Sequence, residues 1–145
     1  AASLALCAAA LGANFIMCSP KKYKVNETIW LAALNKAEKT GARLEWDQNP
    51  HTAIRDSDVI YTDVWVSMGD EEQSKQRMQD LGEYQVTPEL IKIAKNEAIF
   101  MHDMPAHEGE EISEGLLYHP QSVVFDQAEN RLHVQKSLLI YLINN

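Results

Sequence analysis

The chain has 145 residues, of which 46% are hydrophobic, and this is the size and apolar content of a single domain with one core over residues 1–145. Its formal net charge of −8 argues against nucleic acid or an anionic membrane as the partner, because neutralising phosphates requires clustered Lys and Arg. The cysteines, Cys7 and Cys18, lie at the two ends of an expected helix-to-strand unit, a poor arrangement for a disulfide, so we expect a reducing, cytoplasmic location.

The first segment is almost entirely apolar and predicts a buried helix over residues 3–11, followed by a core strand over 15–18. Gly12 stands where a left-handed C-terminal cap is expected. A signal or membrane segment is the alternative, but no Lys or Arg precedes the run, and the Gly-Ala-Asn at 12–14 interrupts it. We therefore expect no targeting or membrane role for this segment.

The next predicted elements end in a third strand, which polar residues follow directly. Asn26 can cap a helix over residues 27–40, which has one apolar face and ends at Gly41. A short strand, a helical turn and a third strand are then expected over residues 44–46, 51–56 and 59–62.

The second half continues the alternation of strands and helices. Residues 70–82 are polar and predict a mobile loop with an exposed helix, and Thr87 with Pro88 is a strong start for a helix that covers 90–95. A fourth strand, a fifth strand and a last helix are expected over residues 98–101, 122–125 and 126–143. The alternation predicts an α/β, Rossmann-like fold of three layers, with a mainly parallel sheet flanked by helices.

Two polar segments follow apolar strands and form the candidate site. Residues 63–69 come directly after the third strand, and residues 102–107 come directly after the fourth. In an open α/β sheet, ligands bind outside the carboxyl ends of parallel strands, where the loops converge. Both segments therefore point to one small-molecule pocket.

These segments resemble the ornithine-binding half of the ornithine carbamoyltransferases, which have an aspartate followed by a Ser-Met-Gly loop and then a His-Cys-Leu-Pro motif. This chain has Asp63, Ser67-Met68-Gly69 and His102-Asp103-Met104-Pro105 at the matching places. The resemblance continues through residues 121–133 and covers nearly the whole chain. It implies the fold of the second domain of these enzymes, here lacking one expected N-terminal strand and the carbamoyl-phosphate domain with its Ser-x-Arg-Thr motif.

The resemblance also implies roles for individual residues. Asp63 with the Ser-Met-Gly loop would hold the amino-acid head group, and Arg131 would lie near the phosphate or carbamoyl group. The implied substrate-binding residues are Asp63, Ser67, Met68, His102, Met104 and Arg131. Asp103 takes the catalytic position but replaces the cysteine of the family. Its carboxylate could accept a proton from the δ-ammonium of ornithine, hold the amine as an unreactive ammonium, or reject the substrate.

Ordinary structural interpretations stand beside these roles. Asp63 at a strand end can cap a turn, and residues 67–69 can be a flexible loop. Arg131 can be a solvated arginine that pairs with Glu129 or Asp126.

The histidines and acids at 102–111 raise the question of a metal ion. Their spacing matches no compact motif such as His-Glu-x-x-His, and Pro105 breaks any helix that would align them, so we expect neither a metal nor a cofactor. The last helix is apolar on all sides over residues 138–143, which requires a cover. We expect a homo-oligomer or a partner chain to supply it.

The sequence leaves two possible functions, one as a domain of an enzyme family and one as a non-catalytic module. The first is an ornithine-carbamoyltransferase-like domain of arginine biosynthesis that binds an amino acid such as L-ornithine, together with carbamoyl phosphate, and is inactive as an isolated chain. The alternative is a non-catalytic module that retains only the fold and binds a ligand or another protein. The missing domain and the missing cysteine favour the alternative for the isolated chain.

Overall fold

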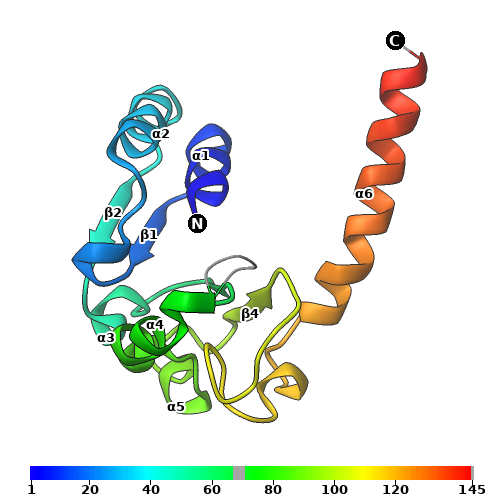
Figure 1. The fold of residues 1–145 in the computed structure, drawn as a ribbon. Helices are drawn as coiled ribbons and strands as arrows, with labels where there is room; N and C mark the ends of the chain where they lie inside the picture. The colour runs from blue at the N-terminus through cyan, green and yellow to red at the C-terminus, as the bar shows by residue number, and fades with distance from the viewer. Residues whose placement is uncertain (67–70, 145) are drawn as a thin grey trace.

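The computed structural model describes residues 1–66 and 71–144, which form short strands connected by helices (Figure 1). The strands are β1 (Phe15–Cys18), β2 (Leu44–Asp47), β3 (Val59–Thr62) and β4 (Ile99–His102). The helices are α1 (Ala2–Leu11), α2 (Glu27–Thr40), α3 (Pro50–Ala53), α4 (Ser74–Leu81), α5 (Pro88–Ile91) and α6 (Val124–Asn144). Short 3₁₀ helices cover Lys21–Tyr23, Glu71–Gln73, Gly82–Tyr84 and Leu116–Tyr118.

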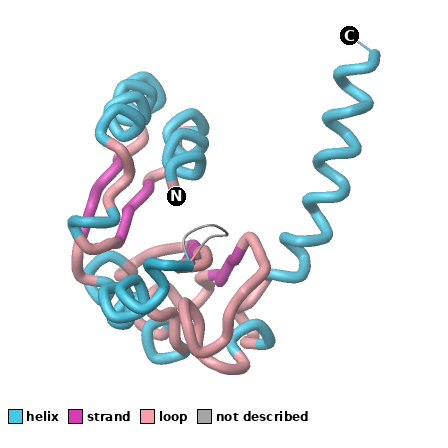
Figure 2. The backbone as a smooth tube through the Cα atoms, viewed as in Figure 1, coloured by secondary structure: helices cyan, strands magenta, loops and turns pink. Residues whose placement is uncertain are grey.

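The strands pair in parallel, as the alternation of strands and helices predicts. Within the described ranges β1 pairs with β2 and β3 pairs with β4, in two separate two-stranded sheets. Figure 2 shows how little of the backbone these strands occupy beside the helices. The mainly parallel α/β class is confirmed, and the strands of the described residues form two separate pairs.

The expected fifth strand over 122–125 is wrong. Only Ser122 forms a bridge, to Phe100, and α6 already begins at Val124. The segment makes two ladder hydrogen bonds, from Phe100 N to Gln121 O and from Val123 N to Phe100 O. Val124 is fully buried as the first residue of a helix, so its apolar side chain reaches the core without a strand.

Local sequence signals set most helix ends. The Asn26 side chain accepts a hydrogen bond from Thr28 N at 2.9 Å and begins α2, and Gly41 ends it with a φ of 79°. Thr87 caps α5 as expected. The helix is shorter than predicted, however, because after Ile91 the chain continues in turns whose N–H groups bond three residues back.

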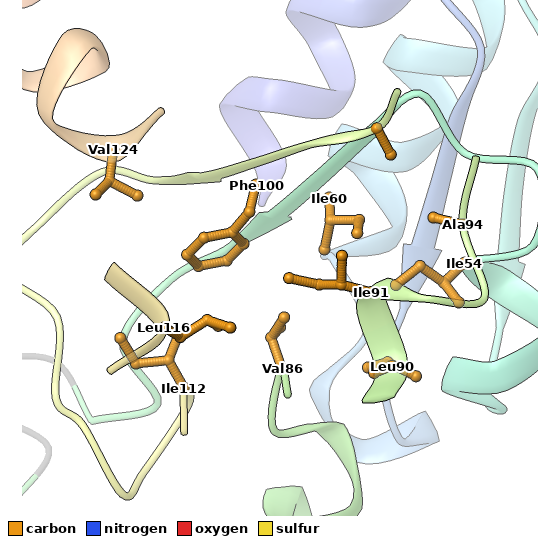
Figure 3. Packing of buried hydrophobic residues seen from close by; sticks show 11 residues of the cluster. Ile54, Ile60, Val86, Leu90, Ile91, Ala94, Phe100, Ile112, Leu116 and Val124 are labelled. Carbon is orange, nitrogen blue, oxygen red and sulfur yellow. The ribbon is translucent and has the colours of Figure 1, made fainter. Parts of the chain in front are cut away.

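Most of the buried apolar residues form two clusters. The larger one surrounds Phe100 of β4, with Ile60 of β3 and Ile91 of α5 beside it (Figure 3). The smaller one joins α1 to α2 and β2 and consists of Ala5, Ala9, Ala33, Ala37 and Leu44. The alanines have small side chains, which lets the two helices approach closely. The larger cluster holds β3 and β4 together and therefore positions the loops that follow them.

Helix α6 extends away from the rest of the structure (Figure 1). From Ala128 to Asn144 every side chain is exposed, and the exposed apolar ones include Leu138, Leu139, Tyr141, Leu142 and Ile143. In the described part of the chain, no helix combines the length and the hydropathy needed to cross a membrane.

Candidate functional site

Asp63 and Asp103 lie side by side at the carboxyl edge of the β3–β4 pair. Thr62 is paired with His102 in the sheet register, so each aspartate directly follows one residue of that pair. Together with Tyr61 they line a cavity of about 400 Å³, whose other wall is the beginning of α1. The two strand ends therefore meet at one pocket, as their position in the sequence predicts.

Burial and the acidic side chains raise the pKa values of groups that line the pocket. Burial, and after it the neighbouring charge of Asp63, raises the pKa of Asp103 above its ordinary value. Asp103 Oδ1 is buried and has no hydrogen-bond partner among the described residues. Burial and the Asp103 charge also raise the pKa of Tyr61. A cation placed here would relieve the repulsion between the two carboxylates.

The buried side chain of His102 stabilises the turn that carries Asp103. The imidazole ring is fully buried, and its Nδ1 accepts a hydrogen bond from Met104 N at 2.9 Å. The ring proton must then be on Nε2, which lies 3.2 Å from Glu111 Oε1 and donates to it. His102 and Met104 thus shape the turn that carries Asp103 and are not among the residues that line the cavity.

Glu111 is the buried acceptor in this arrangement. Burial by itself raises its pKa, but the hydrogen bonds from His102 and from His107 N outweigh this, and the pKa of the carboxyl lies below its ordinary value. The charged form of Glu111 is therefore the one that the site stabilises.

The remaining predicted residues are placed as follows. Arg131 of α6 donates from Nη1 to the main-chain oxygen of Asp103 at 3.4 Å, which brings its guanidinium to the edge of the site. Asp63 Oδ1 accepts a hydrogen bond from Val64 N, which is the turn-capping contact that the structural interpretation anticipates. Ser67 and Met68 lie outside the described residues.

Tyr61 and Gln127 also lie at this site, and neither was predicted from the sequence. Gln127 Nε2 donates to Tyr61 Oη at 3.2 Å, and Gln127 Oε1 accepts from His102 N at 3.0 Å, so Gln127 connects both strand ends to α6. Periodicity could have indicated both residues. Tyr61 is two positions before Asp63 along a strand, and Gln127 is one helical turn before Arg131.

Comparison with known proteins identifies a family over nearly the whole chain. The family model described as aspartate/ornithine carbamoyltransferase, Asp/Orn binding domain, matches residues 1–142. The ornithine carbamoyltransferase of Hyperthermus butylicus is 48% identical over 141 residues, which are 97% of this chain and 45% of that protein. The ornithine carbamoyltransferase of Caldicellulosiruptor saccharolyticus is 43% identical over 98% of this chain and 46% of its own length.

Solved structures give the same result. The ornithine carbamoyltransferase of Pyrococcus furiosus superposes with a TM-score of 0.89 at 42% identity, over 95% of this chain and 44% of that one. The anabolic enzyme of Campylobacter jejuni superposes with a TM-score of 0.93 at 35% identity, over 99% of this chain and 47% of that one. The chain thus spans less than half the length of these relatives. It belongs to the aspartate/ornithine carbamoyltransferase family and corresponds to the Asp/Orn-binding domain of that family.

Proposed function

We propose that this chain is an amino-acid-binding domain that takes a diamino acid such as L-ornithine at the pocket between Asp63 and Asp103. The observation that carries the proposal is the meeting of these two carboxylates at neighbouring ends of β3 and β4, on one cavity. The family membership supports the choice of ligand, since the family model describes an Asp/Orn-binding domain.

The proposed contacts follow from charge. The carboxylate of Asp63 pairs with the α-ammonium of the amino acid in a charge-assisted hydrogen bond. Ser67 and Met68 follow Asp63 in the sequence and are proposed to contact the same head group. Asp103 receives the side-chain ammonium, while His102 and Met104 hold its turn in place.

The family reaction joins the δ-amine of ornithine to the carbamoyl carbon of carbamoyl phosphate, giving citrulline and phosphate. We propose Arg131 as the contact for carbamoyl phosphate, because its guanidinium lies at the site edge and suits a phosphate. The isolated chain should not carry out this reaction. It has a carboxylate at Asp103, which holds the amine protonated and so removes its nucleophilic lone pair.

The non-catalytic function remains the second candidate, and Asp103 is the observation that favours it. A carboxylate with a raised pKa beside a second carboxylate suits cation binding better than transfer chemistry. On either function we expect a cytoplasmic protein, in the first case one of arginine biosynthesis, whose helix α6 is covered by a second copy or a partner chain.

The test is an amide NMR titration of the labelled chain with L-ornithine, with and without carbamoyl phosphate. Binding should shift the signals of residues 61–63 and 102–104, and carbamoyl phosphate should add a shift at Arg131. L-norvaline, which lacks the δ-ammonium, should bind more weakly by about tenfold or more.

A matched pair of variants locates the effect. Asp63→Asn should weaken ornithine binding by about tenfold. Asp58→Asn, at the other end of β3, should leave it unchanged, because Asp58 is exposed and pairs with Lys95. A well-dispersed spectrum that responds to neither ligand would show that only the fold has been retained.

A further inference from the structure

The turn that follows the candidate pocket brings three metal-binding side chains together. The ligand atoms of His107, Glu110 and Glu111 lie within 4.8 Å of one another. The turn is closed by hydrogen bonds from Gly109 N to Ile112 O at 2.8 Å and from Glu110 N to His107 O at 3.1 Å. Sequence spacing did not indicate this arrangement, because a turn rather than a helix aligns the side chains.

Glu111 supplies an observation independent of this clustering. Its side chain is fully buried, and Oε1 accepts from His102 Nε2 and from His107 N. Oε2, by contrast, has no hydrogen-bond partner in the described part of the chain and lies 3.8 Å from His107 Nδ1. A buried carboxylate oxygen without a donor is unfavourable, and a cation between these two atoms would satisfy it.

The negative charges of the turn also favour a cation. Glu111 is the buried carboxylate of the turn, and its ligand atom lies close to those of His107 and Glu110. Glu110 adds a second negative charge beside it. Two carboxylates and one neutral imidazole match the charge of a divalent ion.

We propose that residues 107–111 bind one zinc ion through His107 Nδ1, a carboxylate oxygen of Glu110 and Oε2 of Glu111. One imidazole and two carboxylates are ligands that zinc accepts, whereas calcium and magnesium prefer oxygen ligands alone. The side chain of His107 is 48% exposed, which gives the ion access from solvent and room for water as a fourth ligand.

The ion would act on the neighbouring pocket through Glu111. Tetrahedral zinc ligands lie roughly 3.4 Å apart, so a small closure of the turn is sufficient. Because Glu111 also holds His102, and His102 holds the turn after β4, zinc would make the position of Asp103 more rigid. Zinc binding itself does not depend on the proposed amino-acid function.

The test is calorimetric titration of the folded chain with zinc chloride alone, with cobalt(II) absorption as the spectroscopic readout. We expect one ion per chain, and an affinity loss of about tenfold or more in each of His107→Gln and Glu110→Gln. Glu114→Gln is the matched control, since Glu114 is an exposed acid close to the turn, and it should bind zinc as the parent does.

Amide spectra of each variant show whether the fold is retained, which separates lost ligands from lost structure. The proposal is overturned if the folded parent takes up no zinc. It is equally overturned if zinc binds the folded His107→Gln and Glu110→Gln variants as tightly as the parent, because the ion is then held elsewhere.

Discussion

Asp103 is the residue at which this chain departs most from the motif it resembles. Its carboxylate lies beside that of Asp63, and burial with this neighbouring charge raises its pKa. A cysteine at this place would be neutral and would leave an incoming amine free to lose its proton. We propose that the aspartate instead attracts a protonated amine, so that this one side chain suits the pocket to binding a cation.

The two cysteines should differ sharply in reactivity. Burial, with a further contribution from the charge of Asp47, raises the pKa of Cys18 to about 12. At about pH 8 only roughly one Cys18 in ten thousand is then a thiolate, and the thiolate is the reactive form. Cys7 is exposed on α1. We therefore expect a thiol reagent to label Cys7 rapidly and Cys18 slowly in the folded chain.

Mass spectrometry of the labelled chain checks this expectation. Cys7→Ser should abolish the fast labelling, and urea should expose Cys18. Equal labelling rates of both thiols in the folded parent would contradict the prediction.

At the scale of the element, short-range signals define the long helix α2. Asn26 caps its N-terminus and Gly41 ends it, as the sequence predicts. The alanines that it shares with α1 then decide what it packs against. Local sequence determines where the helix begins and ends, and packing against α1 determines its position in the fold.

Removing the cap should therefore cost stability without changing the fold. Asn26→Ala leaves Thr28 N without its acceptor and should lower the free energy of unfolding by about 1 kcal/mol. Asn26→Asp retains an acceptor and should remain close to the parent. Urea denaturation followed by circular dichroism measures both. Equal losses in the two variants would show that the hydrogen bond is not the cause.

At the scale of the whole molecule, the chain presents more apolar surface than a stable monomer normally does. Helix α6 is exposed over nearly its full length, and its last two turns are apolar on every side. The parallel strands are divided into two separate pairs. Exposed apolar surface of this kind is typical of interaction sites, and we propose that another copy of the chain or a partner chain covers α6.

The isolated chain should associate through α6. We expect its mass in light scattering to rise with concentration, because burial of the apolar helix removes it from water. Replacing Leu139 and Leu142 by Glu should shift the chain toward the monomer, since both are more than half exposed and lie on one helical face. Gln135→Glu on the same face is the matched control. A parent that is monomeric at every concentration would contradict the prediction.

The sequence could predict those features of the fold that depend on neighbouring residues. The caps at Asn26 and Thr87 and the polar residues at the ends of β3 and β4 follow from local composition. The apolar run at 122–125 did not distinguish a strand from a helix start, because either one buries Val124. Membership of the family followed from motifs that are themselves local.

Contacts between distant segments decided the rest. His102 turns inward to Glu111, and Gln127 connects Tyr61 with the main chain of His102. Neither contact can be derived from spacing, because each depends on how the loop after β4 and the helix α6 fold back on the strand ends. A short motif specifies which groups are available, but the direction of each side chain is set by the packing around it, and only the folded chain supplies that packing.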